Sequence, residues 1–447
     1  MSATNRSKVK NNISTTMHRP FIAIVGLGYV GAPLALAFSK HYEVVGFDIN
    51  RQRIDELRSG YDRTLESTPE EIKTLVAERR ISFTSHPEDI SEADIFVITV
   101  PTPVSDAQVP DMSCVMDASR TVGKVMKKGA IVVYESTVYP GASEDECVPV
   151  LVEASRLNYP GDFAIGYSPE RINPGDQIHT LTNTTKIVSG DRPEVLDILA
   201  NLYGKITTVH RAPTIKVAES AKVLENVQRD VNIALMNEVY QIFSRCGVNT
   251  HAVLEAAGTK WNFLKFTPGL VGGHCISVDP YYLSHKAMRE GFPAKLILTA
   301  RQTNDSMPAF VVDQLVRKLA STIGLSSSTV VTVLGVTFKE NVPDVRNSKV
   351  TEIVNELSKF GTKVQVVDPL AHADEVVHEL GLELTSISVA QANPADAVIL
   401  AVPHDEFLEN GGWDLISRLA KPGKALVMDF KGTLDTREAP SELMVIS

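Results

Sequence analysis

Short apolar segments alternate with helical segments along the first part of the chain, and each apolar segment ends in glycine, proline or a polar residue. The first of them, Phe21–Val25, is followed by a glycine cluster and by a helical run over residues 32–39. Short apolar strands that alternate with helices are typical of a parallel sheet with helices packed on its faces. We therefore predict an N-terminal α/β domain over residues 20–210, with further strands at Glu43–Phe47, 95–100 and 130–135.

The pattern changes after Pro213, because residues 214–246 contain neither glycine nor proline. One continuous helix over this range would be about 45–50 Å long. A helix that is apolar on several sides is usually buried between other bodies, so we expect a homodimer built on it. The helical pattern continues to about residue 320 and predicts a central helical domain over residues 211–322. The apolar positions of the long helix are Val217, Ala221, Leu224, Val227, Val231 and Leu235.

A second α/β pattern follows, with predicted strands at Val330–Leu334, Lys363–Val367 and 397–402. Two phrases of the first α/β region recur in it: residues 93–98 (ADIFVI) resemble 395–400 (ADAVIL), and residues 46–48 resemble 366–368. We therefore predict an α/β fold with two Rossmann-like parallel-sheet domains, joined by the central helical domain. The C-terminal one covers residues 323–447, and residues 1–19 form a polar, disordered leader.

The amino-acid composition excludes several classes of protein and of partner. With 447 residues, 43% of them hydrophobic and 22% charged, the chain is an ordinary globular protein of about three domains. Its net charge of −10 argues against nucleic acid as a partner, so an anionic ligand would need locally concentrated cations. The four cysteines form no C-x-x-C pair, which predicts neither a disulfide framework nor a bound metal and fits a reducing cytoplasm. Residues 21–39 are uncharged, but their glycines and proline argue against a signal peptide or membrane anchor.

Gly26, Gly28 and Gly31 form a G-x-G-x-x-G motif between the first strand and the first helix. This context is what the dinucleotide fingerprint requires. The first glycine permits the tight turn, the second lets a pyrophosphate approach the backbone, and the third lets helix and strand pack closely. The amides near Tyr29 and Val30 would meet the pyrophosphate at the helix N-terminus.

Asp48, twenty-two residues after Gly26, ends the second strand and would accept hydrogen bonds from the adenosine ribose. A carboxylate there repels a 2′-phosphate, so we expect NAD rather than NADP, although the nearby Arg53 leaves NADP open as an alternative. Thr102 and Thr137 follow later strands, where an open α/β sheet binds its ligands, and are candidate cofactor neighbours or ordinary loop caps.

The segment 272–280 combines two glycines, Cys275 and, four residues later, Asp279. Such a cysteine is either a buried structural residue or a nucleophile activated by a nearby cation or base. The long helix could supply that cation, because Lys222, Asn226 and Arg229 are spaced i, i+4 and i+7 on one face. They form either a solvated stripe or a site for an oxyanion.

Three further groups remain open between a structural and a functional role. Glu170 and Arg171 stand together in a loop after an apolar strand, as a surface pair or as part of a catalytic site. Lys339 and Arg346 follow the first strand of the second α/β region, as surface charges or as phosphate ligands.

Taken together, these residues resemble the UDP-glucose/GDP-mannose dehydrogenase family, and the likeness runs from about residue 21 to residue 431. Within the family, residues 260–275 are most similar to the bacterial UDP-N-acetylglucosamine and UDP-N-acetylgalactosamine 6-dehydrogenases. The motifs that carry the resemblance are the glycine fingerprint, 100–103 (VPTP), 135–141, 168–171 (SPER), 222–226, 272–280 and 335–346.

The resemblance implies a four-electron oxidation of a sugar C6 alcohol to a carboxylate with two NAD, for the synthesis of surface polysaccharides such as capsule or O-antigen. It implies that Cys275 is the nucleophile, and that Lys222 and Asn226 stabilise oxyanions and position water. Asp279 would take part in water and base chemistry, and Glu170 in thioester hydrolysis.

The resemblance also implies a UDP-sugar site in the C-terminal domain and adds Thr137 to the catalytic residues. UDP-glucose enzymes often carry a second glutamate where this chain has Pro174, which argues against UDP-glucose. UDP-glucose and UDP-N-acetylmannosamine remain alternative substrates, and a two-electron β-hydroxyacid dehydrogenase or a non-enzymatic NAD sensor remain alternative functions. Besides Lys222 and Asn226, the substrate-binding positions would be Arg171, Arg229, Gly269, Lys339 and Arg346.

Overall fold

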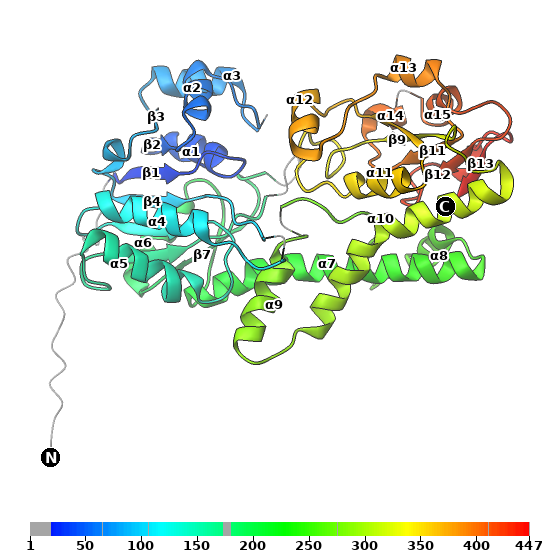
Figure 1. Cartoon of the computed structure of the whole chain (residues 1–447). Helices are drawn as coiled ribbons and strands as arrows, with labels where there is room; N and C mark the ends of the chain where they lie inside the picture. Colours follow the sequence, from blue (N-terminus) through cyan, green and yellow to red (C-terminus); the bar gives the residue numbers. More distant parts are fainter. Residues whose placement is uncertain are drawn as a thin grey trace. The chain divides into compact units, whose positions relative to one another are not determined.

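The computed structural model describes residues 19–64, 66–105, 107–172, 180–274, 276–409 and 411–446. The chain divides into two compact units (Figure 1). The first extends to Glu225 and includes Tyr281–Glu290, and the second contains Asn226–Pro280 and Gly291–Ser447. Most of the predicted leader lies outside the described residues. The division into three domains stays a prediction, since most of the expected central domain groups with the second unit.

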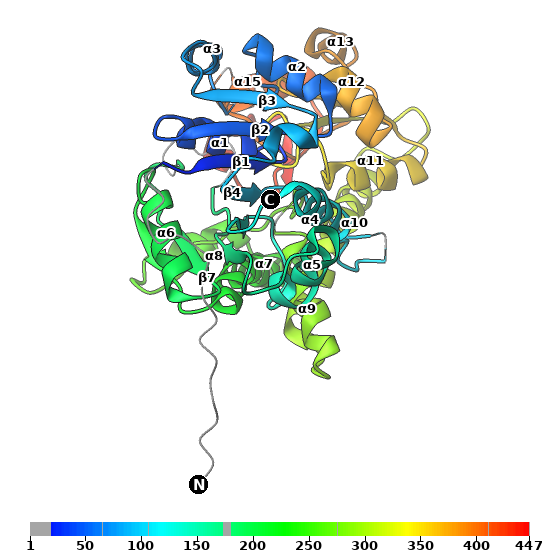
Figure 2. The same cartoon turned by 90° about the vertical axis from the view of Figure 1, so that its left-hand side faces the viewer.

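An eight-stranded sheet forms the centre of the first unit, in the order β3-β2-β1-β4-β5-β6-β7-β8. Figure 2, which looks onto this unit, shows β3, β2, β1 and β4 in that sequence. The predicted strands are confirmed to within two residues at each end. The strands are β1 (Phe21–Val25), β2 (Glu43–Phe47), β3 (Ile81–Thr84), β4 (Ile95–Ile98), β5 (Ile131–Tyr134), β6 (Ala164–Tyr167), β7 (Lys186–Gly190) and β8 (Val209–Arg211).

Helices cover this sheet, and four of them (α1, α2, α3 and α6, with bounds given below) contribute apolar side chains to one core with the strands. Ile22, Ile24 and Val97 are fully buried, which explains why the strands are continuously apolar and do not alternate. The helices of this unit are α1 (Gly31–Ser39), α2 (Arg51–Ser59), α3 (Pro69–Ala77), α4 (Ser113–Val125), α5 (Val148–Ser155), α6 (Pro193–Tyr203) and most of α9 (Asp279–Arg289).

One strand pair departs from the expected all-parallel sheet. β7 runs antiparallel to β6, with Tyr167 opposite Ser189 and Gly166 opposite Gly190. After β6 the chain reverses direction and forms the adjacent strand without a crossover connection. The first residue of β7, Lys186, therefore lies at the edge of the sheet where β5 and β6 end. This reversal brings a cation to the carboxyl edge of the sheet.

The second unit contains a five-stranded, fully parallel sheet in the order β10-β9-β11-β12-β13. The phrases repeated in the sequence, residues 46–48 and 366–368, end β2 and β10, each of which pairs with the first strand of its sheet. The strands are β9 (Val330–Leu334), β10 (Lys363–Val367), β11 (Ala397–Leu400), β12 (Leu426–Met428) and β13 (Met444–Ile446).

Several helices of the second unit pack on this sheet, and α10 shares its core through Val311, Val312 and Leu315. None of the helices within the described ranges combines the length and apolar content needed to cross a bilayer. The helices are α8 (Thr250–Ala257), α10 (Lys295–Thr322), α11 (Val350–Lys359), α12 (Ala373–Glu375), α13 (Ile387–Ala392), α14 (Asp405–Glu409) and α15 (Trp413–Leu419).

The long helix is confirmed as α7 (Ile215–Cys246), and a buried polar network joins its second half to α10. Arg301 Nη1 lies 2.5 Å from Asp230 Oδ1, and both side chains are almost fully buried. Asn304 donates to the same carboxylate oxygen and accepts from Asn237. Asn237 in turn binds both the amide N–H and the carbonyl of Gly269, at 2.8 and 3.0 Å. The network therefore fixes the backbone of a predicted substrate-binding position.

We expect Arg301→Met to lower the free energy of unfolding by about 3–5 kcal/mol, because Asp230 would remain as a buried charge that has lost its cation. Arg317→Met is the matched control: it removes an exposed ion pair with Asp313 on the same helix, at a cost below about 1 kcal/mol. Urea denaturation of both variants measures the difference. Equal midpoints would contradict a structural role for the buried pair.

Candidate active site

The loop that contains Gly26, Gly28 and Gly31 has the predicted geometry: a tight turn, an open backbone and a close contact between helix and strand. Gly26 has a φ of +95°, and its amide donates to Phe47 O at 2.8 Å. A Cβ on Gly31 would lie 1.8 Å from the carbonyl oxygen of Gly26, so helix α1 could not start there with any other residue. A Cβ on Gly28 would have nothing within 4 Å. The backbone around Gly28 is thus open to a ligand, and Tyr29 and Val30 precede the first turn of α1, where helix N–H groups point outward.

Asp48 lies beside this loop at the carboxyl end of β2. Its carboxylate accepts from the amides of Leu27 and Asn50, each at 2.8 Å, which fixes its orientation. Arg53 is buried, with its guanidinium 2.7 Å from Asp62 and its Nε donating to Leu27 O. These contacts brace the glycine loop from behind, and a direct role for Arg53 in cofactor binding stays a prediction.

Thr102 and Thr137 lie in the loops after β4 and β5, which are neighbours in the sheet. The Ser136 hydroxyl donates to Val100 O at 2.7 Å and joins these two loops. Both threonines are partly exposed. The structure therefore brings both of them to the carboxyl edge that also carries the glycine loop and Asp48.

Glu170 belongs to a buried cluster of charges that the sequence analysis did not foresee. Lys186 Nζ lies 2.8 Å from Glu170 Oε2 and 2.5 Å from Glu135 Oε2. The other oxygen of Glu170 accepts from the amides of Arg171 and Ile172, at 2.6 and 2.7 Å. Burial by itself would raise the pKa of Glu170, but Lys186 and these amides outweigh it, and the pKa lies below its ordinary value. The carboxylate is thus held ionised.

Arg171 points away from this cluster. Its guanidinium lies 2.8 Å from Glu225 on α7 and donates to Thr185 O. Glu225 stands one turn after Lys222, which is itself buried. The structure therefore links the predicted Glu170–Arg171 loop to the helix that carries Lys222.

The next residue of α7 is Asn226, and its side-chain amide donates to Asp279 Oδ2 at 2.5 Å. Two predicted catalytic residues from separate helices are thus in direct contact, and both are buried. Arg229, by contrast, is exposed. Cys275 itself lies outside the described residues.

The segment just before Cys275 packs on the loop that follows β9. The amide of Gly273 donates to Asn347 O at 3.2 Å, and a Cβ on Gly273 would lie 2.7 Å from the ring of Phe338. His274 Nε2 lies 3.4 Å from Asp344, whose carboxylate also receives the forked guanidinium of Arg346 at 3.0 and 2.7 Å. Burial opposes ionisation of Asp344, but His274 and Arg346 hold its pKa well below the usual range.

Residues 272–274 are therefore in contact with the loop after β9, and both segments belong to motifs that the sequence predicted to be functional. The same loop carries Lys339, which is partly exposed. Lys431 adds a cation that the sequence analysis left out. Its side chain lies beside Gly269 and pairs with Glu340, and burial lowers its pKa to about 8. Its position just after β12 was the available signal, because ligands bind at the carboxyl ends of parallel strands.

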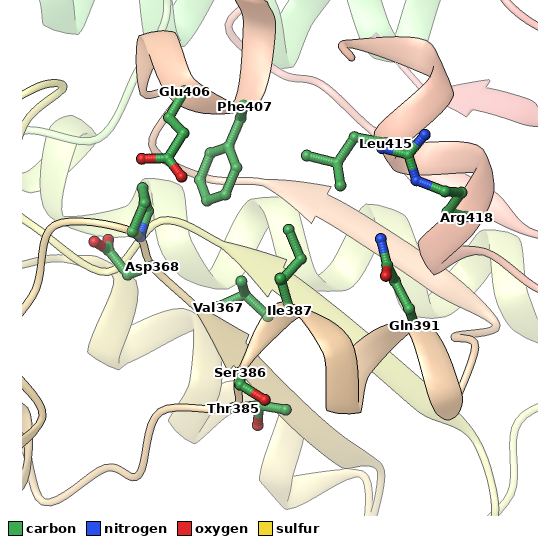
Figure 3. A pocket seen from close by; sticks show the side chains of 11 residues that line it. Val367, Asp368, Thr385, Ser386, Ile387, Gln391, Glu406, Phe407, Leu415 and Arg418 are labelled. Carbon is green, nitrogen blue, oxygen red and sulfur yellow. The ribbon is translucent and has the colours of Figure 1, made fainter. Parts of the chain in front are cut away.

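A pocket of about 330 Å³ opens elsewhere in the second unit, at the carboxyl end of β10 (Figure 3). Ile387, Phe407 and Leu415 line its apolar part, and Gln391 and Arg418 contribute polar groups. It contains none of the predicted substrate residues.

The counterpart of the dinucleotide loop in this unit is closed. Gly335 repeats the positive φ of Gly26, but Thr337 and Glu340 stand where Gly28 and Gly31 would be. Asp368, the counterpart of Asp48, accepts from the amides of Val336 and Leu370 and contacts His404 at 3.1 Å. Its side chain is fully buried, whereas Asp48 is partly exposed.

Comparison with protein-family models matches the two α/β regions to domains that bind different ligands. Residues 21–207 match the NAD binding domain of the UDP-glucose/GDP-mannose dehydrogenase family, residues 216–306 its central domain, and residues 332–436 its UDP binding domain.

Individual relatives match almost the whole chain. A UDP-N-acetyl-D-glucosamine 6-dehydrogenase of Pseudomonas aeruginosa is 50% identical over 416 residues, which cover 93% of this chain and 97% of the relative. One of Salmonella typhi is 47% identical over 94% of this chain and 98% of its own. The solved UDP-D-ManNAc dehydrogenase of Pyrococcus horikoshii superposes with a TM-score of 0.85 at 31% identity, covering 95% of this chain and 99% of that one. The chain belongs to the UDP-glucose/GDP-mannose dehydrogenase family.

Proposed function

We propose that this protein oxidises the C6 hydroxyl of UDP-N-acetyl-D-glucosamine to a carboxylate with two molecules of NAD. The observation that carries the proposal is the contact between residues 272–274 and the loop of Asp344 and Arg346. It supports the proposal because the residues that precede Cys275 in the sequence pack against a loop that carries Lys339 and Arg346, two cations suited to a diphosphate. The choice of sugar is supported by the two relatives at about half identity, which carry that activity in their names.

The residues fit the two oxidation steps. NAD supplies the chemistry of hydride acceptance, first from the alcohol and then from the adduct that Cys275 forms with the aldehyde. Loss of the second hydride leaves a thioester on Cys275, and water releases the acid. Overall, one alcohol, one water and two NAD⁺ give one carboxylate, two NADH and three protons.

Lys222 and Asn226 stabilise the developing oxyanions, and Asp279, held by Asn226, orients water or accepts a proton. Glu170 assists thioester hydrolysis, and Thr137, in the loop after β5, would contact the bound cofactor and take part in catalysis. Asp48 and the glycine loop hold NAD, together with Thr102. The substrate is bound by Arg171, Arg229, Gly269, Lys339 and Arg346. We add Lys431 to this set because its side chain lies beside Gly269.

We further propose that the protein is a cytoplasmic homodimer and that each chain is divided into the three domains predicted from the sequence. The product would be used for the synthesis of surface polysaccharide. Support for the dimer comes from apolar side chains in the central region that are more than half exposed, since a monomer rarely leaves so many in water. These are Leu224, Leu235, Trp261, Leu264, Met288, Phe292 and Leu296, with Trp261 91% exposed.

Two NADH should accumulate per UDP-N-acetyl-D-glucosamine, and mass spectrometry should find an acid as the product. Purified protein is assayed with the UDP derivatives of N-acetylglucosamine, N-acetylgalactosamine, N-acetylmannosamine and glucose, and we expect the highest kcat/KM with the first. One NADH per sugar and a released aldehyde or ketone would instead indicate a two-electron dehydrogenase.

Cys275→Ser should abolish steady turnover while NAD affinity is retained, because a serine hydroxyl has a far higher pKa than a thiol and is a poor nucleophile. The control is Cys246→Ser, which changes an exposed cysteine at the end of α7 and should keep wild-type turnover. Initial rates and NAD titration measure both variants. Near-normal turnover of Cys275→Ser would show that this cysteine is structural.

Gly28→Ala should leave the fold intact but weaken NAD binding by about tenfold or more, some 1.4 kcal/mol, because its methyl group would fill the open space at the loop. Gly31→Ala should instead lower the melting temperature of the free protein, because its methyl group would collide with Gly26 O. Calorimetric titration and thermal unfolding separate the two effects. Unchanged NAD affinity in Gly28→Ala would remove the loop from the cofactor site.

A further inference from the structure

One cation and two carboxylates are buried together in the first unit. The side chains of Lys186, Glu135 and Glu170 are 3%, 0% and 12% exposed. The Tyr203 hydroxyl donates to the remaining oxygen of Glu135 at 2.5 Å. Since a buried charge is costly unless it is paired, one lysine cannot fully compensate two carboxylates. Burial accordingly raises the pKa of Glu135 to about 7, although Lys186 opposes the shift.

The sheet itself builds this cluster. Continuing the antiparallel register of β6 and β7 by three residues places Glu170 directly opposite Lys186. Glu135 immediately follows β5, the other neighbour of β6. The three groups therefore project from adjacent strand ends, and Thr137 lies only two residues beyond Glu135.

The surroundings leave Glu170 little freedom. Two backbone amides occupy one of its oxygens and Lys186 the other. The titratable groups that face Glu135 are Lys186, Glu170 and Tyr203. The guanidinium of Arg171 is engaged with Glu225 and Thr185 O instead. Lys186 is thus the cation shared by both carboxylates. When Glu135 is protonated and neutral, Glu170 is the only carboxylate that the lysine charge compensates.

We propose that Lys186 and Glu135 are positioning residues for the reaction: Lys186 holds the Glu170 carboxylate ionised and in place, and Glu135 sets, by gaining or losing a proton, how much of the lysine charge Glu170 receives. This inference rests on the proposed function, in which Glu170 assists hydrolysis of the thioester on Cys275. Neither residue touches the substrate in this role.

The test compares three variants by the pH dependence of kcat and by acid-quench mass spectrometry of the covalent adduct on Cys275. In Lys186→Met, Glu170 becomes harder to ionise, so the acidic limb of the kcat profile should move up by about one pH unit or more. At neutral pH, kcat should fall roughly tenfold to a hundredfold and the thioester should accumulate. In Glu135→Gln, Lys186 is paired with the Glu170 carboxylate alone, which should lower the pKa of Glu170. The acidic limb of the kcat profile should therefore move to lower pH.

The double variant Lys186→Met/Glu135→Gln separates positioning from folding. The ionised wild-type cluster carries one positive and two negative charges, a net −1, and the double variant keeps −1 on Glu170 alone. It should therefore fold even where Lys186→Met does not, yet still accumulate thioester. Lys421→Met is the control, because it removes a lysine from Asp396 in the second unit and should leave the pH profile unchanged.

Wild-type hydrolysis and a wild-type pH profile in both Glu135→Gln and the double variant would overturn the inference and leave the cluster a structural one. A wild-type protein that forms no NADH from any UDP-sugar would instead overturn the proposed function. The two failures are therefore distinguishable in the same set of assays.

Discussion

Parallel pairing of β1 with β2 and β4 is the constraint on which the rest of the first unit depends. It places the glycine loop, Asp48 and Thr102 at one edge of the sheet, because each follows the carboxyl end of a strand. The contact between Gly31 and Gly26 O then lets α1 start immediately behind the loop. The antiparallel β7 adds what parallel strands cannot supply, a strand that begins at this edge, and Lys186 is its first residue.

The two α/β units show how one scaffold diverges. Both place a positive-φ glycine after the first strand and an aspartate after the second. In the first unit the aspartate lies beside an open loop. In the second, Thr337 replaces a glycine, and the buried His404 fills the space next to Asp368. The same backbone positions that serve a ligand in one unit stabilise the fold in the other.

The sequence predicted the apolar strands and the long helix well, since both follow from local patterns of apolar residues, glycine and proline. It predicted the individual site residues largely through motifs. The contact of Asn226 with Asp279 brings together two residues that helical spacing and a family resemblance had identified separately.

What could not be predicted depends on contacts between distant residues. Lys186 looks like an ordinary charge at the start of a strand until the antiparallel register places Glu170 opposite it. Arg301 looks like a surface charge on α10 until Asp230, seventy-one residues earlier, is found beside it. Lys431 follows a strand of only three residues, so its position after a strand end was a weak signal in the sequence.

The closed loop in the second unit has a kinetic consequence for the proposed reaction. If the only dinucleotide cradle among the described residues is that of the first unit, both hydrides must leave through the same place, one after the other. Spent cofactor has to dissociate and fresh cofactor has to enter while the sugar is half oxidised. A free aldehyde could diffuse away or react elsewhere during this exchange. A covalent bond to the protein would keep the intermediate in place for as long as the exchange takes.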